Sequence, residues 1–390
     1  MTLHKTIKLF GVTAFLVFGA IAAQAAPFMI VGNDEKQGFA EDGKAIFSPA
    51  GKDSVLIVDL ANPLNPKIVA NLKLKNSIVG PPVNVDIDPT GSIAIVADSM
   101  DMTKAGDALK PVPDDKIYVI DLKAKPAKLV ATLSGAKQPS GLSINAAGTL
   151  ALVANRAGKS ISILSIKGAE AKIVGTVDMG EEVSHVVFTP DGKHALATKF
   201  AGHKVAQLDV DGEKVTDTKH DLPVGLWPYN IAVTPNGSLA LTTDNGNQGT
   251  SDGNVDTVSV IDLTARPPRV IDHIAVPDSP EGLAISPDGR IAAVIDAVGS
   301  NKDRKSFMYH RGGMATILRI KGKTVTKLKD IEVGALPEAV CFSADGRFLY
   351  VGNYIDRDFS ILRVNGSRVT DTGKRFKVPG QPASARCSRH

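Results

Sequence analysis

Six residues of chemically active types stand at matching places in short apolar runs of the chain: one histidine, two glutamates, one lysine, one tyrosine and the only tryptophan. They are His185, Glu281, Glu338, Lys199, Tyr229 and Trp227. A histidine or a carboxyl group can transfer a proton, a lysine can hold an anion, and an aromatic ring can stack on a ligand. These types together predict a ligand pocket, with His185 as the candidate catalytic acid or base.

A second set of candidates is polar. One polar residue ends the second apolar run of each repeat, and Asp296 and Asn353 are the two of these that we add to the predicted ligand-binding set. Asn230 follows Tyr229 directly, and Arg311 lies in a long loop as a second possible anion clamp. Asn and Asp side chains also cap turns by bonding loop backbone groups. The sequence therefore leaves open whether the Asn/Asp positions bind a ligand or only close turns.

These residues are positioned by one repeated phrase, which is clearest between residues 333 and 364. It contains three apolar runs, AVCFS, RFLYVGN and FSILRV, separated by an ADG turn and a polar loop. Short runs rich in Val, Ile, Phe and Tyr between Gly and Asp are typical of antiparallel strands joined by hairpins. The phrase recurs from residues 83, 141, 185, 230 and 282. A period of about 45 residues is typical of propeller blades.

The seventh copy of the repeat is split between the two ends of the chain. A second strand (27–33) and a third strand (53–60) come first, and residues 378–388 repeat the beginning of a blade. The sequence predicts an all-β fold, a seven-bladed β-propeller of four-stranded antiparallel blades, closed by the C-terminal strand pairing into the first blade. Such closure removes the exposed edge strands that promote aggregation.

Two pairs of residues are predicted to join neighbouring blades near this closure. Cys341 and Cys387 lie on innermost strands at positions of opposite parity, which puts their side chains on facing sides of adjacent sheets. We predict a disulfide between them, with two separately buried thiols as the alternative. Asp86 and Arg386 stand at equivalent positions in adjacent blades, which predicts an ion pair near the ring closure, with a channel-lining role as the alternative.

The repeat motif, P-x-x-Val-x-Val-S-P-D-G…Y-V-x-N, resembles that of YVTN-type seven-bladed propeller proteins, including lactonase-like relatives, over nearly all of the chain after residue 25. The segment 184–192, SHVVFTPDG, is similar to lactonase-like first strands that begin Pro-His, although its proline is missing and one blade alone carries the histidine. The resemblance allows a lactone-opening or cyclising activity. His185 with Glu281 or Glu338 would then transfer a proton, and Lys199 or Arg311 would hold an anion.

The loops divide onto two faces because strand direction alternates. The turns between first and second strands are short and uniform, whereas the opposite face, here called the long-loop face, carries the insertions 99–115, 245–256 and 297–313. Variable loops on a rigid scaffold are typical of binding sites. Our leading interpretation is a protein without catalytic activity that binds a small molecule or a protein partner on this face. The alternative is a lactonase-like hydrolase or cyclase centred on His185.

The first 25 residues carry two lysines, an apolar run and an A-Q-A cleavage site, which predicts a secretory signal peptide followed by one domain over 26–390. We expect a periplasmic monomer with no membrane span after cleavage. The formal net charge of +4 and the absence of a clustered basic stripe argue against a nucleic-acid partner.

No cofactor and no metal are expected. The loop 244–256 has Asp252, Asn254 and Asp256 at alternate positions, as at the start of a calcium loop. Thr257 and Leu263 occupy the places where such a loop has its glycine and its bidentate acid, so the calcium pattern fails.

Overall fold

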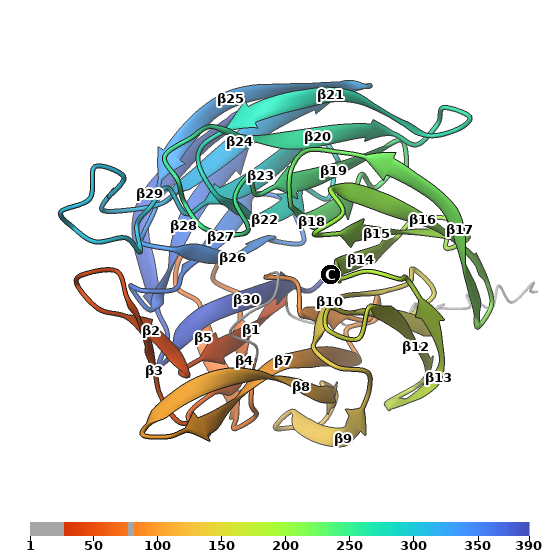
Figure 1. Cartoon of the computed structure of the whole chain (residues 1–390), viewed down its shortest axis with the longest axis horizontal. Helices are drawn as coiled ribbons and strands as arrows, with labels where there is room; N and C mark the ends of the chain where they lie inside the picture. Colours follow the sequence, from red (N-terminus) through yellow and green to blue (C-terminus); the bar gives the residue numbers. More distant parts are fainter. Residues whose placement is uncertain (1–26, 77–81, 390) are drawn as a thin grey trace, which may run out of the picture.

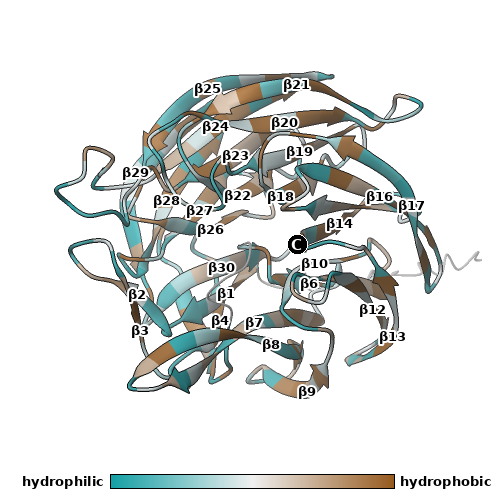
Figure 2. Cartoon of the chain, in the orientation of Figure 1, coloured by the Kyte–Doolittle hydropathy of each residue, from teal (hydrophilic) through white to brown (hydrophobic). Residues whose placement is uncertain are grey.

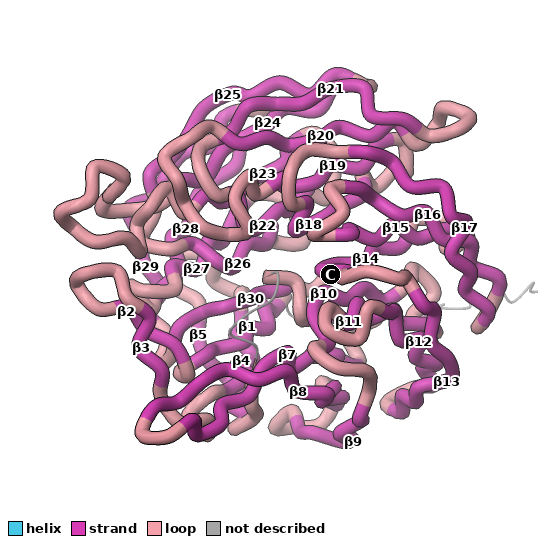
Figure 3. Tube along the Cα trace, viewed as in Figure 1, coloured by secondary structure: helices cyan, strands magenta, loops and turns pink. Residues whose placement is uncertain are grey.

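The computed structural model describes residues 27–76 and 82–389, and this part of the chain is a seven-bladed β-propeller (Figure 1). Each blade is a four-stranded antiparallel sheet, and the described residues contain strands and loops without any helix (Figure 3). The predicted fold class is confirmed. The predicted signal peptide, residues 1–25, lies outside the described residues. Within the described ranges there is no helix with the length and apolar character needed to cross a membrane.

The blades are numbered in chain order, and the strands of each are given from the innermost outward. Blade one contains β30 (Gln381–Cys387), β1 (Phe28–Asp34), β4 (Ser54–Asp59) and β5 (Lys67–Leu72). Blade two contains β6 (Val85–Ile87), β7 (Ile93–Ala105), β8 (Ala108–Asp121) and β9 (Lys128–Ser134). Blade three contains β10 (Pro139–Ile144), β11 (Leu150–Asn155), β12 (Ser160–Lys167) and β13 (Glu170–Asp178).

The remaining four blades follow the same order. Blade four contains β14 (Val183–Phe188), β15 (His194–Lys199), β16 (Lys204–Asp211) and β17 (Lys214–Pro223). Blade five contains β18 (Pro228–Val233), β19 (Leu239–Asp244), β20 (Asp256–Asp262) and β21 (Arg269–Val276). Blade six contains β22 (Pro280–Ile285), β23 (Ile291–Asp296), β24 (Met314–Lys321) and β25 (Thr324–Glu332). Blade seven contains β26 (Pro337–Phe342), β27 (Phe348–Asn353), β28 (Asp358–Asn365) and β29 (Arg368–Lys377).

The core lies between the blades, because each sheet packs both of its faces on neighbouring sheets. Second strands such as β11 and β23 are buried at every residue, whereas the outermost strand β13 alternates between exposed and half-buried positions. Figure 2 shows that outer strands such as β21 and β25 carry both hydrophobic (brown) and hydrophilic (teal) residues. Leu239 and Val260 of blade five, for example, pack in one cluster with Val294 and Leu318 of blade six. Sheet-on-sheet packing of this kind holds the ring together.

Ring closure follows the prediction. Strand β30 leads the end of the chain to the centre of the ring (Figure 1) and pairs with β1, with Cys387 opposite Met29. Cys341 and Cys387 form a disulfide with their Cα atoms 5.7 Å apart. The Nε atom of Arg386 lies 3.1 Å from Oδ1 of Asp86, which confirms the predicted ion pair between blades one and two.

Two additions to the blades were not predicted. The insertion at 99–115 continues strands β7 and β8 as a long hairpin, with Ala105 opposite Ala108. A small hairpin of β2 (Gln37–Phe39) and β3 (Ala45–Phe47) leaves blade one and reaches the 297–313 loop of blade six. There Glu41 pairs with Arg304 at 3.4 Å. The long-loop face is therefore bridged across blade seven.

The sequence also gave no indication that Lys36 would be buried. Lys36 is 0% exposed, and its Nζ atom donates to Oδ2 of Asp53 and to the backbone oxygen of Asn76 and lies 3.7 Å from Oδ1 of Asp34. The nearby Asp98 is also fully buried, and burial raises its pKa to about 8. The positive charge of Lys36 is therefore shared by several carboxyl groups at the junction of blades one and two.

Candidate functional site

Two kinds of residue surround the ring axis on the long-loop face. They are the residues that begin the first strands and the residues that directly follow the second strands. Tyr229, Glu281 and Glu338 are each the second residue of an innermost strand, in blades five, six and seven. Arg156 and Phe200 directly follow the second strands of blades three and four. The antiparallel order of first and second strands brings these two kinds of position to the same end of the ring.

Arg156 is the centre of this group. Its side chain is 8% exposed and lies over two aromatic rings, 4.9 Å from the ring centre of Phe200 and 5.7 Å from that of Tyr229. Its Nε and Nη1 atoms have no hydrogen-bond partner among the described residues. A buried guanidinium normally has a carboxylate or carbonyl partner, so two donors remain for a ligand.

Trp227 extends the aromatic surface. Its ring centre lies 5.0 Å from that of Phe200 and 5.0 Å from that of His203, and the side chain is half-buried. Its backbone has a φ of 55°, and the residues before the opening prolines of blades three, six and seven share this conformation (Gln138, Ser279 and Leu336, with φ of 60°, 58° and 50°). The left-handed turn before the opening proline is therefore shared by blades three, five, six and seven.

Glu281 and Glu338 form an acidic pair in adjacent blades. Burial raises the pKa of Glu281 to about 7, despite hydrogen bonds of 3.3 Å each from Asn245 Nδ2 and Ser279 Oγ to its Oε1 atom. Burial, and then the negative charge of Glu281, raises the pKa of Glu338 well above its ordinary value. Arg156 acts in the opposite direction on Glu281. Near neutral pH, such a pair holds a proton that it can give or take.

These residues are called the axial cluster below: Arg156, Phe200, Trp227, Tyr229, Asn245, Glu281 and Glu338. The structure thus brings together four of the residues predicted from the sequence, Trp227, Tyr229, Glu281 and Glu338. Arg156, Phe200 and Asn245 were missed. Each stands one position after the polar residue that ends a second strand (Asn155, Lys199 and Asp244), and that shared place was the available signal.

His185 lies deeper in the ring than the axial cluster. It is 3% exposed, and its Nδ1 atom accepts a hydrogen bond of 3.2 Å from the backbone N–H of Ile231 in blade five. Burial, together with the positive charge of Arg386, lowers the pKa of His185 to about 3. The imidazole is neutral at physiological pH and is a weak base. Asn230 is also buried.

Three other predicted residues are engaged within their own blades. Lys199 pairs with Asp221 at 2.9 Å and lies 3.7 Å from Glu181, so its charge is already balanced. Asp296 is fully buried and accepts a hydrogen bond of 2.7 Å from Thr316 in the third strand. Asn353, also fully buried, donates to Asp358 and Ser360 in the third strand of blade seven.

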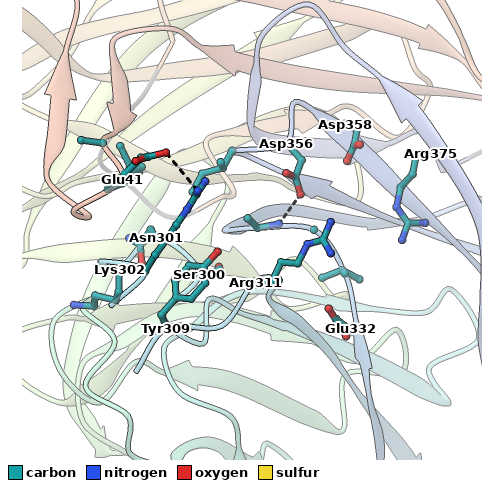
Figure 4. A pocket seen from close by; sticks show the side chains of 18 residues that line it. Glu41, Ser300, Asn301, Lys302, Tyr309, Arg311, Glu332, Asp356, Asp358 and Arg375 are labelled. Carbon is teal, nitrogen blue, oxygen red and sulfur yellow. Dashed lines mark hydrogen bonds and ion pairs between the residues drawn. The ribbon is translucent and has the colours of Figure 1, made fainter. Parts of the chain in front are cut away.

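Arg311 lies apart from the axial cluster, in a pocket of about 440 Å³ between the β2–β3 hairpin, the 297–313 loop and blade seven. We call this the rim pocket. In Figure 4, Arg311 points into it, with Asp356 on one side and Glu332 on the other. The lining carries charges of both signs, and the Asp356 carboxylate accepts a hydrogen bond of 2.8 Å from the backbone N–H of Ala335.

The axial cluster can bind an anion, stack a ring and transfer a proton. Its residue types do not favour a metal, and among residues 27–76 and 82–389 no group of three or more His, Cys, Asp or Glu side chains is placed to hold one. The loop 244–256 instead forms internal bonds, such as that from Asn254 N to Asp252 Oδ1 at 2.9 Å.

Comparison with known proteins identifies the fold. No family model matches the chain, and no curated protein sequence does. Solved structures, by contrast, do match the chain. The periplasmic gluconolactonase PpgL of Pseudomonas aeruginosa aligns with a TM-score of 0.64 and 17% identity over 93% of this chain and 99% of that one. A Bacteroides fragilis protein described as a "putative 6-phosphogluconolactonase" aligns with a TM-score of 0.69 and 16% identity over 95% of this chain and 99% of that one.

A Desulfotomaculum acetoxidans protein described as functionally unknown is equally similar, with a TM-score of 0.69, 14% identity and coverage of 93% of this chain and 98% of that one. At these identities the likeness concerns the backbone alone. The chain is a seven-bladed β-propeller of the architecture that lactonase-like proteins share.

Proposed function

We propose that the axial cluster binds a small hydroxylated acid, such as a sugar acid, at the long-loop end of the ring. The observation that carries the proposal is the Arg156 guanidinium, which is 8% exposed and has two nitrogens without a partner among the described residues. Leaving buried donors unpaired costs free energy, which a bound carboxylate or phosphate would recover through charge-assisted hydrogen bonds.

The other members of the axial cluster suit the rest of such a ligand. The carboxyl groups of Glu281 and Glu338 and the amide of Asn245 are acceptors and donors for hydroxyl groups. The half-buried ring of Trp227 offers an apolar face on which a sugar ring can stack. The proposal includes export by the predicted signal peptide to the periplasm and a monomeric state. A protein partner on the long-loop face is the other ligand class that our first interpretation names.

A second candidate function is lactone hydrolysis or its reverse, cyclisation, and the acidic pair favours it. In hydrolysis, the ionised carboxylate of the pair would take a proton from water as the water oxygen bonds to the lactone carbonyl carbon. The ring C–O bond would then break, and its oxygen would take a proton from the protonated partner, giving the hydroxy acid. Arg156 would hold the anionic group. The gluconolactonase description of a structural neighbour supports this candidate. Here His185 remains the proposed alternative acid or base.

The single tryptophan, Trp227, provides the test, because its fluorescence reports on the site without any label. We would titrate gluconate and 6-phosphogluconate, with glucose as the uncharged control, against wild type, Arg156→Gln and Arg319→Gln. Arg319 is an exposed arginine on β24 and serves as the matched control. The proposal expects saturable binding of the acids by wild type and the control, weakened about 10- to 100-fold in Arg156→Gln, as expected for a lost charge-assisted bond.

Turnover is measured separately, as acid release from δ-gluconolactone above the spontaneous rate. Glu281→Gln abolishes it if the acidic pair moves the proton, whereas His185→Ala abolishes it only if the histidine does. Equal affinity of wild type and Arg156→Gln for both acids would refute the binding site. Binding without turnover would leave the protein a binder and reject the enzyme.

A further inference from the structure

A second cavity, of about 360 Å³, lies at the other end of the ring axis. Its lining comes from the ends of innermost strands, next to the short turns: Val233 of β18 and Ile285 of β22 each end their strand there, and Arg389 follows β30. The axial cluster is built from the starts of those same strands. The two sites therefore occupy opposite ends of one ring. We call this one the turn-end cavity.

One wall of the turn-end cavity is apolar. Blades four to seven contribute Val187, Ile231, Val233, Leu283, Ile285, Val340 and Phe342. Val187, Val233 and Ile285 are only half-buried, although innermost strands are otherwise almost fully buried. Aliphatic side chains that keep contact with water inside a hollow favour an apolar occupant.

The opposite wall is cationic. Arg386 and Arg389 both face Asp86, through Nε at 3.1 Å and Nη2 at 3.9 Å. Two guanidinium groups share one carboxylate, which leaves one positive charge over. Their side chains are 32% and 44% exposed, so they remain reachable from the cavity. Each of the two contacts to Asp86 uses a single nitrogen of the guanidinium group.

We propose that the turn-end cavity is a second ligand site, which takes an amphipathic monoanion: one carboxylate or sulfonate on a compact hydrocarbon body. The anionic group would lie against Arg386 and Arg389, and the hydrocarbon against the wall of Val233, Leu283 and Ile285. A cavity of about 360 Å³ is in the range of small-molecule sites. This site does not depend on the function proposed for the axial cluster.

The test uses 1-anilinonaphthalene-8-sulfonate, a fluorescent amphipathic monoanion, with 4-phenylbutyrate as competitor and 4-phenylbutanol as its uncharged analogue. The variants are Arg389→Gln, which removes the surplus charge, and Val233→Asp, which places a negative charge in the apolar wall. Arg368→Gln, on the exposed start of β29, is the matched control. Unchanged Trp227 emission and thermal unfolding identify the variants that are folded.

We expect saturable binding by wild type and Arg368→Gln, at least tenfold weaker in Arg389→Gln and in Val233→Asp. The bound probe should be displaced by 4-phenylbutyrate but not by 4-phenylbutanol, and saturating gluconate should leave it in place. Equal affinity of wild type and the folded variants for the probe would overturn the site. Displacement by the alcohol as readily as by the acid would overturn the requirement for an anion.

Discussion

The Nδ1 atom of His185 accepts a hydrogen bond of 3.2 Å from the backbone N–H of Ile231, which joins blade four to blade five. On its other side the imidazole lies against Gly141 of blade three, where an added Cβ atom would stand 2.7 Å from Cδ2 of the ring. The histidine is therefore wedged between three blades.

Replacing Gly141 by Ala should lower the free energy of unfolding by about 1–3 kcal/mol, because the new methyl group would overpack His185 and the backbone of Ser184. Urea unfolding followed by Trp227 fluorescence measures the effect. Gly175→Ala is the control, since a Cβ atom there meets only Ile163 Cδ1 at 3.4 Å. If both variants unfold at the same urea concentration, His185 is not tightly packed against blade three.

Glu281→Gln should make the protein more stable at pH 8 and change little at pH 4. Burial raises the pKa of Glu281 to about 7, above its unfolded value, so the folded state binds more protons between about pH 4.5 and 7. The wild-type contribution of this group therefore falls as pH rises through that window, by up to about 3 kcal/mol. Urea midpoints of wild type and variant across pH 4–8 measure it. Parallel curves would show that Glu281 titrates normally.

Lys36→Met should lower the free energy of unfolding by about 3–5 kcal/mol, because it leaves the buried carboxylates of Asp53 and Asp34 without their cation. Lys44→Met breaks an exposed pair with Asp42 and is the matched control, expected to leave the unfolding midpoint in place. A double variant, Lys36→Met with Asp53→Asn, should recover part of the loss. Additive losses in the double variant would contradict a direct ion pair.

Replacing both Cys341 and Cys387 by Ser should lower the free energy of unfolding by about 4 kcal/mol, since the disulfide closes a loop of 46 residues in the unfolded chain. The reduced wild type, measured in the same urea series, should match the double serine variant. An oxidised wild type no more stable than that variant would show that the strand pairing of β30 with β1 suffices for closure.

The fold was predictable because the same pattern of strands and turns recurs in every blade. Each blade carries its own turn residues and apolar runs, and the blade lacking a first strand identified residues 378–388 as the closing strand. Local parity then sufficed for the Cys341–Cys387 disulfide.

The site was only partly predictable, because its key residue has no local signature. Arg156 reads as an ordinary surface arginine after a strand, and only the neighbouring blades supply the rings of Phe200 and Tyr229 on which it lies. Conversely, Asp296 and Asn353 end second strands as predicted, yet they bond hydroxyl or carboxyl groups on the third strand of their own blades. The position of a residue in the repeat predicts at which end of the ring it lies. It does not predict whether its side chain faces the axis or bonds within its own blade.

The pairing of β30 with β1 also determines when the ring can close, because the two strands come from opposite ends of the propeller sequence. A ribosome makes β1 among the first strands of the ring and β30 last, so blade one waits with an unpaired inner edge while the other six blades are being synthesised. The circle stays open until β30 is present to pair with β1. A chain released before β30 would keep that edge free to pair with another copy. The arrival of β30 is thus the step that closes the ring within a single molecule.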